Sequence, residues 1–185
     1  MKSNLQIISG KYRGKKLFLP NDARPTQNMA RSALFNMLLP IINNNEQICV
    51  WDVFAGSGAF GLECLSRYDD VKVVFTDNNP NSIDTIKKNL SAISANTNAT
   101  VEKNDAISLI GKYGQISNLI FIDPPYADFG LGMLFVKKIT KLAKSGTILI
   151  WEFENIQKAT NIDDSWDVLK DKTYGRARFF VLMKK

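Results

Sequence analysis

The chain has 185 residues, 45% of them hydrophobic and 23% charged, which is typical of a folded, soluble protein rather than a disordered or fibrous one. It contains no histidine, so histidine triads, histidine metal ligands and imidazole general bases are excluded. No apolar run reaches the roughly 20 residues that a membrane helix needs, and we expect a cytoplasmic protein without a membrane span or signal peptide.

The formal net charge of +6 is concentrated near the start of the chain. Residues 1–31 hold seven basic residues and one acid, whereas the remainder holds 17 of each. This surplus predicts a polyanion-binding arm, whose candidate phosphate contacts are Lys11, Arg13, Lys15, Lys16, Arg24 and Arg31. A solvated tail is the alternative, but apolar residues interleave the charges in "LQIISGKYRGKKLFLP", which favours a folded β-hairpin over residues 5–19.

A helix is predicted next, over residues 27–39, because apolar residues recur there at helical spacing and Pro40 follows. The polar loop 43–47 then separates an N-terminal unit, residues 1–45, from a larger unit, residues 46–185.

Strand and helix signals alternate along the larger unit. Strands are predicted at 48–54, 71–76, 99–103, 118–122 and 146–152, with helices at 59–68, 80–92, 105–112 and 130–144. This alternation predicts an α/β fold: a Rossmann-like, doubly wound, mostly parallel sheet. The tail around residues 173–175 has no room for a crossover helix, so it is expected to form a C-terminal antiparallel hairpin.

A glycine loop joins the first of these strands to its helix. In "DVFAGSGAFGLE", Gly56, Gly58 and Gly61 form the pattern G-x-G-x-x-G, which permits a tight turn and close approach of a ligand. A nicotinamide dinucleotide and S-adenosylmethionine both fit such a loop. Asp52, four residues before the first glycine, would repel a pyrophosphate but suits a sulfonium and an ammonium group. This favours S-adenosylmethionine as the cofactor, with Phe54 and Ser57 as further contacts.

Two further acids are candidate cofactor ligands. Asp77 ends the second strand, where a carboxylate can accept hydrogen bonds from both ribose hydroxyls, although an acid at a helix N-terminus is the alternative. Asp105 follows the third strand and fits a helix N-cap or an adenine contact equally well. Cys49 and Cys64, without histidine partners, are expected to be reduced core residues, so we predict no metal site.

The segment "FIDPPYADF" places Asp123 at the carboxyl end of an apolar strand. Pro124 and Pro125 each remove a backbone N–H and fix φ, so the acid leaves the sheet in a stiff, extended segment that offers carbonyl acceptors. A strand terminator with a solvated aspartate is the alternative. Two prolines followed by Tyr126 count against that alternative, and the role of the group depends on the rest of the chain.

With the glycine loop and "DPPY" together, the chain resembles the class I S-adenosylmethionine-dependent methyltransferases that modify exocyclic amines. More specifically, it resembles the RsmD family of bacterial 16S rRNA guanine-N2 methyltransferases, in "IISGKYRGKKL", "RPT" with "LFNML", "DVFAGSGAFGLECLSR", "DPPY" and "YGRARFFVL". Asn28 and Met29 depart from the Asp-Arg pair usual in that family.

The resemblance implies methyl transfer to a guanine N2 amine of 16S rRNA in the assembled small ribosomal subunit. It makes residues 1–45 an RNA-binding extension, with the basic residues of the arm as candidate RNA contacts, and residues 46–185 the S-adenosylmethionine-dependent methyltransferase domain. We expect a monomer. Asp123 and the Pro124 carbonyl would stabilise charge developing on the amine. Tyr126 would stack on a base swung out of its helix or loop, and Arg176 in the terminal hairpin is a further candidate RNA contact.

Three other functions fit parts of the sequence. An adenine-N6 DNA methyltransferase can carry the same four residues, but it usually needs an added recognition domain, and only about 45 residues precede the catalytic sheet here. A non-catalytic RNA-binding protein on a methyltransferase fold would be expected to show decay of the glycine loop or "DPPY", and both are intact. A nicotinamide oxidoreductase is the third.

Overall fold

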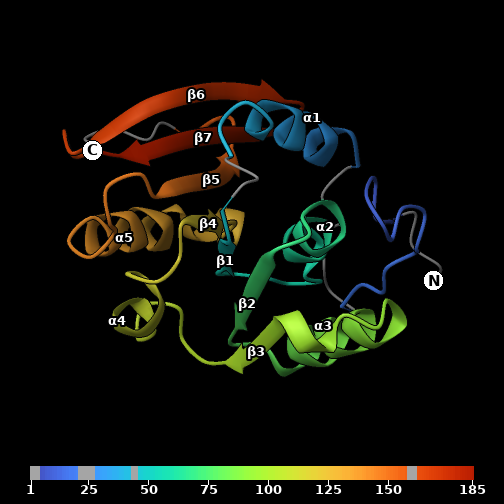
Figure 1. Ribbon diagram of the computed structural model, residues 1–185. Helices are drawn as coiled ribbons and strands as arrows, with labels where there is room; N and C mark the ends of the chain where they lie inside the picture. The colour runs from blue at the N-terminus through green and yellow to red at the C-terminus, as the bar shows by residue number, and fades with distance from the viewer. Residues whose placement is uncertain (1–4, 21–27, 43–45, 158–161) are drawn as a thin grey trace.

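The computed structural model describes residues 5–20, 28–42, 46–157 and 162–185 (Figure 1). Within these ranges, seven strands form one sheet of order β3-β2-β1-β4-β5-β7-β6. Strands β1 to β5 pair in parallel, and β7 pairs antiparallel with both β5 and β6. The strands are β1 (Ile48–Asp52), β2 (Val71–Asp77), β3 (Ala99–Lys103), β4 (Leu119–Ile122), β5 (Ile148–Glu154), β6 (Trp166–Tyr174) and β7 (Ala177–Lys184). The predicted Rossmann-like sheet with a C-terminal antiparallel hairpin is confirmed.

Helices cover both faces of the sheet (Figure 1). Alternate strand residues face opposite sides, so Val50 and Phe121 pack on one side and Trp51 and Ile122 on the other. The first side is covered by α1 (Asn28–Leu38), α2 (Ala59–Arg67) and α3 (Pro80–Ala92), and the second by α4 (Ile110–Tyr113) and α5 (Phe129–Ile139). Two short 3-10 turns, η1 (Asn96–Asn98) and η2 (Tyr126–Asp128), complete the elements. No helix in the described ranges is long and apolar enough to cross a membrane.

Local side-chain hydrogen bonds decide where two helices begin. The Asn79 side chain accepts a hydrogen bond from the N–H of Asn81, and Pro80 follows at the first helical position, which fixes the start of α3. The helix predicted over residues 105–112 is shorter than expected and starts at Ile110. Its first part is a turn, because the Asp105 carboxylate accepts from the Ser108 N–H and the Ser108 hydroxyl donates back to the Asp105 carbonyl.

The hairpin predicted over residues 5–19 forms around one antiparallel bridge, between Gln6 and Lys16, and its cross-strand hydrogen bonds include those from Ile7 N–H to the Lys15 carbonyl and from Leu17 N–H to the Leu5 carbonyl. Two of its other backbone donors, the N–H groups of Ile8 and Ser9, donate to the Glu63 carboxylate of α2, at 2.8 and 2.9 Å. The N–H of Lys11 likewise donates to the Ser66 carbonyl at 2.8 Å. The segment therefore lies against α2 and packs its apolar residues into the same core as α1 and α2. The division into units at residue 45 stays a prediction.

Candidate active site

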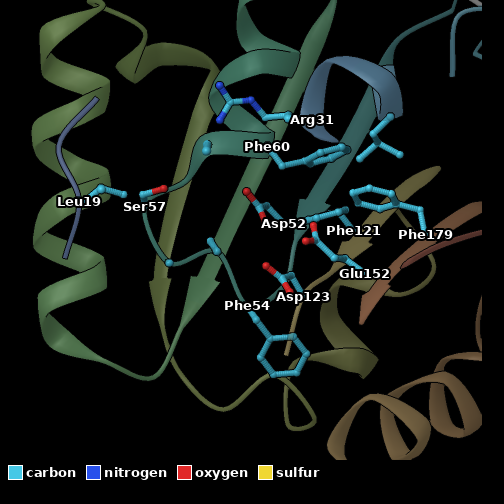
Figure 2. A pocket seen from close by; sticks show the side chains of 14 residues that line it. Leu19, Arg31, Asp52, Phe54, Ser57, Phe60, Phe121, Asp123, Glu152 and Phe179 are labelled. Atoms are coloured by element: carbon cyan, nitrogen blue, oxygen red, sulfur yellow. The ribbon is translucent and has the colours of Figure 1, made fainter. Parts of the chain in front are cut away.

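A cavity lies at the carboxyl ends of β1, β4 and β5, on the face covered by α1 and α2 (Figure 2). The strand order reverses between β1 and β4, and in open α/β sheets ligands bind at this edge, beside such a switch point. Six residues predicted from the sequence as site residues line this cavity: Arg31, Asp52, Phe54, Gly56, Ser57 and Asp123. The glycine loop and the aspartate of "DPPY", far apart in the sequence, thus share one site.

The glycine loop needs its glycines for different reasons. Gly56 and Gly58 have φ values of 54° and 76°, in the left-handed region that favours glycine. Gly61 lies inside α2, where a Cβ atom would come within 2.4 Å of the Phe75 ring. This third glycine therefore serves the packing of α2 on β2, while the first two shape the turn.

Asp52 is buried at the base of the loop, with 1% of its surface exposed. Its carboxylate accepts a hydrogen bond from the Gly61 N–H at 3.0 Å, which ties the end of β1 to the first turn of α2. Burial raises the pKa of Asp52 well above its ordinary value, and the nearby Asp123 and Asp77 raise it further, against the opposing effect of the Gly61 bond. A cationic ligand group beside Asp52 would offset the cost of this buried charge.

Asp77 holds the other side of the loop. Its two carboxylate oxygens accept hydrogen bonds from the N–H groups of Gly56 and Asn79, each at 2.8 Å. The acid therefore fixes the loop directly, and each oxygen keeps a second acceptor position for a ligand. Asp105 is exposed and caps the turn that ends at Ser108, and it does not line the cavity.

Asp123 leaves the end of β4 partly buried, and Pro124 behind it is buried. Burial raises the pKa of Asp123 to about 7. The Pro125 carbonyl accepts a hydrogen bond from the Asp128 N–H at 2.7 Å, which closes the turn η2. The side chain of Tyr126, predicted to stack on the base, lies outside the described part of the structure.

Four predicted RNA contacts, Lys11, Arg13, Lys15 and Lys16, are exposed on one loop. This loop is held at the carboxyl end of α2, where Tyr12 N–H donates to the Ser66 hydroxyl at 3.0 Å. The cavity lies at the other end of this nine-residue helix, roughly 13 Å away at about 1.5 Å per residue. The basic loop therefore lies beyond the cavity, at a distance that a substrate several nucleotides long can span.

The remaining predicted RNA contacts are placed differently. Arg176 is exposed and pairs with Glu154 at the end of β5. Arg24 lies outside the described residues. Arg31 was expected on the basic surface, but it lies on the buried face of α1, 2% exposed, with its Nε 3.8 Å from Glu63 Oε2. Arg31 compensates a buried carboxylate, which argues against a direct phosphate contact.

Sequence reasoning missed three polar residues around the site. Glu63 and Asn89 are buried on α2 and α3, and Glu152 is buried at β5 where it lines the cavity. In the sequence, Glu63 and Asn89 look like ordinary exposed helix residues, and no neighbouring residue indicates that they are buried. Glu152 did carry a signal, since it ends an apolar strand run as Asp52 and Asp123 do.

Comparison with known proteins agrees with this geometry. A family profile described as "Conserved hypothetical protein 95" matches residues 5–183. Ribosomal RNA small subunit methyltransferase D of Escherichia coli strain K12 is 34% identical over 182 residues, covering 95% of this chain and 87% of the relative. The protein of the same name from Haemophilus influenzae is 32% identical over 181 residues, covering 94% and 91%.

Solved structures show the same relationship. The putative methyltransferase yhhF from Escherichia coli superposes with a TM-score of 0.83 at 28% identity, covering 98% of each chain. A putative methylase from Haemophilus influenzae gives a TM-score of 0.77 at 28% identity, covering 97% of this chain and 98% of that one. With matches that run nearly from end to end, the chain belongs to the RsmD family, whose named members are ribosomal RNA small subunit methyltransferases.

Proposed function

We propose that this enzyme transfers a methyl group from S-adenosylmethionine to the N2 amine of a guanine in 16S rRNA, within the assembled small subunit. The observation that carries the proposal is the position of Asp123 beside the glycine loop. Asp52 pairs in register with Phe121, so Asp123 follows two residues later on the neighbouring strand. A donor on the loop and an amine at Asp123 would therefore be neighbours. We expect the enzyme to act as a monomer in the cytoplasm.

The residues present fit the cofactor. The carboxylate of Asp52 lines the cavity beside the glycine loop and suits a ligand that carries a sulfonium and an ammonium group. The space around a Cβ atom at Gly56 is open, which leaves the loop backbone accessible. Asp77 is placed to accept the ribose hydroxyls while it holds the loop. When bound, S-adenosylmethionine supplies an electrophilic methyl group.

The reaction mainly requires hydrogen-bond acceptors beside the N2 amine. Guanine N2 is a poor nucleophile, because its lone pair is delocalised into the ring, and it develops positive charge on its hydrogens as it attacks. The Asp123 carboxylate and the Pro124 carbonyl would accept hydrogen bonds from these hydrogens and stabilise that charge. The two prolines hold both acceptors in place before reaction. A cationic donor beside Asp123 favours the ionised carboxylate.

The basic loop would hold the RNA. Lys11, Arg13, Lys15 and Lys16 are exposed and can contact phosphates without changing their own packing. The residues that follow lead toward the site, since Leu19 lines the cavity. Phosphate contacts on the loop would position the substrate, while the cavity would select the base.

The test uses small ribosomal subunits from a strain that lacks the enzyme. These subunits, naked 16S rRNA and duplex DNA are each incubated with methyl-labelled S-adenosylmethionine, and the modified base is mapped. We expect label on one guanine N2 of the 16S rRNA, with subunits as the preferred substrate. Label on adenine N6 of DNA, or no label on any substrate, would overturn the proposal.

A further inference from the structure

Glu152 is a buried carboxylate that the transfer step proposed above does not use. It is 2% exposed and lines the same cavity as Asp123. Figure 2 shows its carboxylate turned toward those of Asp52 and Asp123. A charged group held at this depth beside a ligand site is a candidate for direct contact with the ligand.

The sheet register places Glu152 next to Asp123 on the side away from the cofactor loop. Ile122 of β4 pairs with Trp151 of β5, so Asp123 and Glu152 follow at the same level of adjacent strands, about 4.8 Å apart in the sheet. On its other side Glu152 pairs with Phe179 of β7. The glycine loop follows β1, across β4 from Glu152. An amine held at Asp123 for transfer would thus have the rest of its ring over Glu152 and Phe179.

A second observation points to a polar ligand in the same cavity. Arg31 lines the cavity at 2% exposure, and its Nε and Nη1 atoms have no hydrogen-bond partner within the described residues. Buried donors of this kind normally have a partner. A polar ligand with acceptors of its own would satisfy them.

We propose that Glu152 reads the Watson–Crick edge of the target guanine. Its carboxylate accepts hydrogen bonds from N1–H and from one N2 hydrogen, while Asp123 accepts the other N2 hydrogen. Adenine and 2-aminopurine present an acceptor at N1, which a carboxylate repels. The inference rests on the proposed guanine-N2 transfer, and it makes Glu152 the residue that selects guanine.

The test compares two bases in two proteins. Small subunits are reconstituted with guanine or 2-aminopurine at the mapped target, since 2-aminopurine keeps the N2 amine and lacks N1–H. For the wild-type enzyme, kcat/KM should be about 10-fold to 100-fold higher with guanine, the range for one well-made pair of base contacts. In Glu152→Gln the ratio of kcat/KM for guanine to kcat/KM for 2-aminopurine should fall to about one, because the amide can donate to N1 of 2-aminopurine and still accept from N2. A purely structural role would lower both rates equally and leave their ratio unchanged, which would overturn the inference.

Glu154→Gln is the matched control, because Glu154 ends the same strand, pairs with Arg176 and lies outside the cavity lining. Its base preference should equal that of the wild type. Thermal unfolding and cofactor affinity show whether Glu152→Gln is folded. If it is not folded, the wild-type enzyme alone decides: equal kcat/KM values for guanine and 2-aminopurine would refute the inference. Failure of the proposed function is a different result, in which the wild-type enzyme does not methylate guanine at all.

Discussion

The guanidinium of Arg31 and the carboxylate of Glu63 form a buried pair between α1 and α2, with 3.8 Å between Nε and Oε2 and side-chain exposures of 3% and 0%. Glu63 also accepts hydrogen bonds from Arg67 Nε at 2.7 Å and from the N–H groups of Ile8 and Ser9. One carboxylate therefore joins α1, α2 and the N-terminal segment. Its charge is balanced by two guanidinium groups, which is the condition under which a buried ion is tolerated.

Glu63→Ala should destabilise the protein by about 3–5 kcal/mol, because it leaves Arg31 buried without its partner and two backbone donors without acceptors. Urea denaturation measures this loss. Glu102→Gln is the control, since Glu102 pairs with Lys112 at the surface, and it should shift the midpoint little. Equal shifts for the two variants would mean that the Glu63 cluster contributes no more than a surface pair.

Asp123→Ala should reduce the rate of methyl transfer by about 10²- to 10³-fold, as expected when a hydrogen-bonding partner of the transition state is removed. Cofactor affinity should change little, because the bond gains its strength only as charge develops on the amine. Single-turnover kinetics at saturating cofactor, with calorimetry for the affinity, separates these effects. Turnover near the wild-type rate would remove Asp123 from the catalytic role.

The raised pKa of Asp123 also predicts a pH dependence of stability. Its folded pKa is about 7, whereas an unfolded aspartate titrates near 4. Between these values the folded protein holds a proton that the unfolded chain has released, so the contribution of Asp123 to stability falls as pH rises through this window. Asp123→Asn should remove that contribution. The free energy of unfolding of the variant, relative to that of the wild type, should be higher at pH 7.5 than at pH 5. The same difference at both pH values would contradict the raised pKa.

Asp77→Ala should weaken S-adenosylmethionine binding by about tenfold or more and affect turnover less at saturating cofactor. The residue holds the Gly56 N–H and, as proposed, would bind a ribose that does not react, so its loss should act on ground and transition states alike. Calorimetry measures the affinity. Asp84→Ala, an exposed substitution on α3, should leave it unchanged. Equal affinities for both variants would refute the role of Asp77.

Changing Lys11, Arg13, Lys15 and Lys16 to Gln should weaken RNA binding and flatten its dependence on salt, by about 0.7 to 0.9 in the log–log slope for each phosphate that the protein no longer neutralises. Cofactor affinity should not change. The control removes the same charge elsewhere, from the exposed residues Lys137, Lys138, Lys141 and Lys144 at and after α5. If the two proteins show parallel slopes, the basic loop is not the RNA-binding element.

The strand and helix alternation predicted the sheet because its signal is local: apolar runs, glycines and prolines act within a few residues. The same holds for the glycine loop and for Asp123, because each directly follows an apolar run that predicts a strand. Burial of Arg31 was not predictable in this way. It depends on Glu63, 32 residues later, and a charged residue on a helix reads as exposed until its partner is known. The N-terminal hairpin was predicted correctly, but its attachment to α2 through the N–H groups of Ile8 and Ser9 was not, because that contact also depends on Glu63, far along the chain.

Asn89 links the segment that follows the basic loop to the glycine loop. This buried amide accepts from the Phe18 N–H and donates to the carbonyls of Phe18 and Ser57. The segment that follows the basic loop is therefore joined to the glycine loop through the side chain of Asn89. A movement of either segment strains the other, and coupling of this kind is reciprocal. If RNA bound to the basic loop changes the affinity for the methyl donor by some factor, the donor must change the affinity for RNA by the same factor.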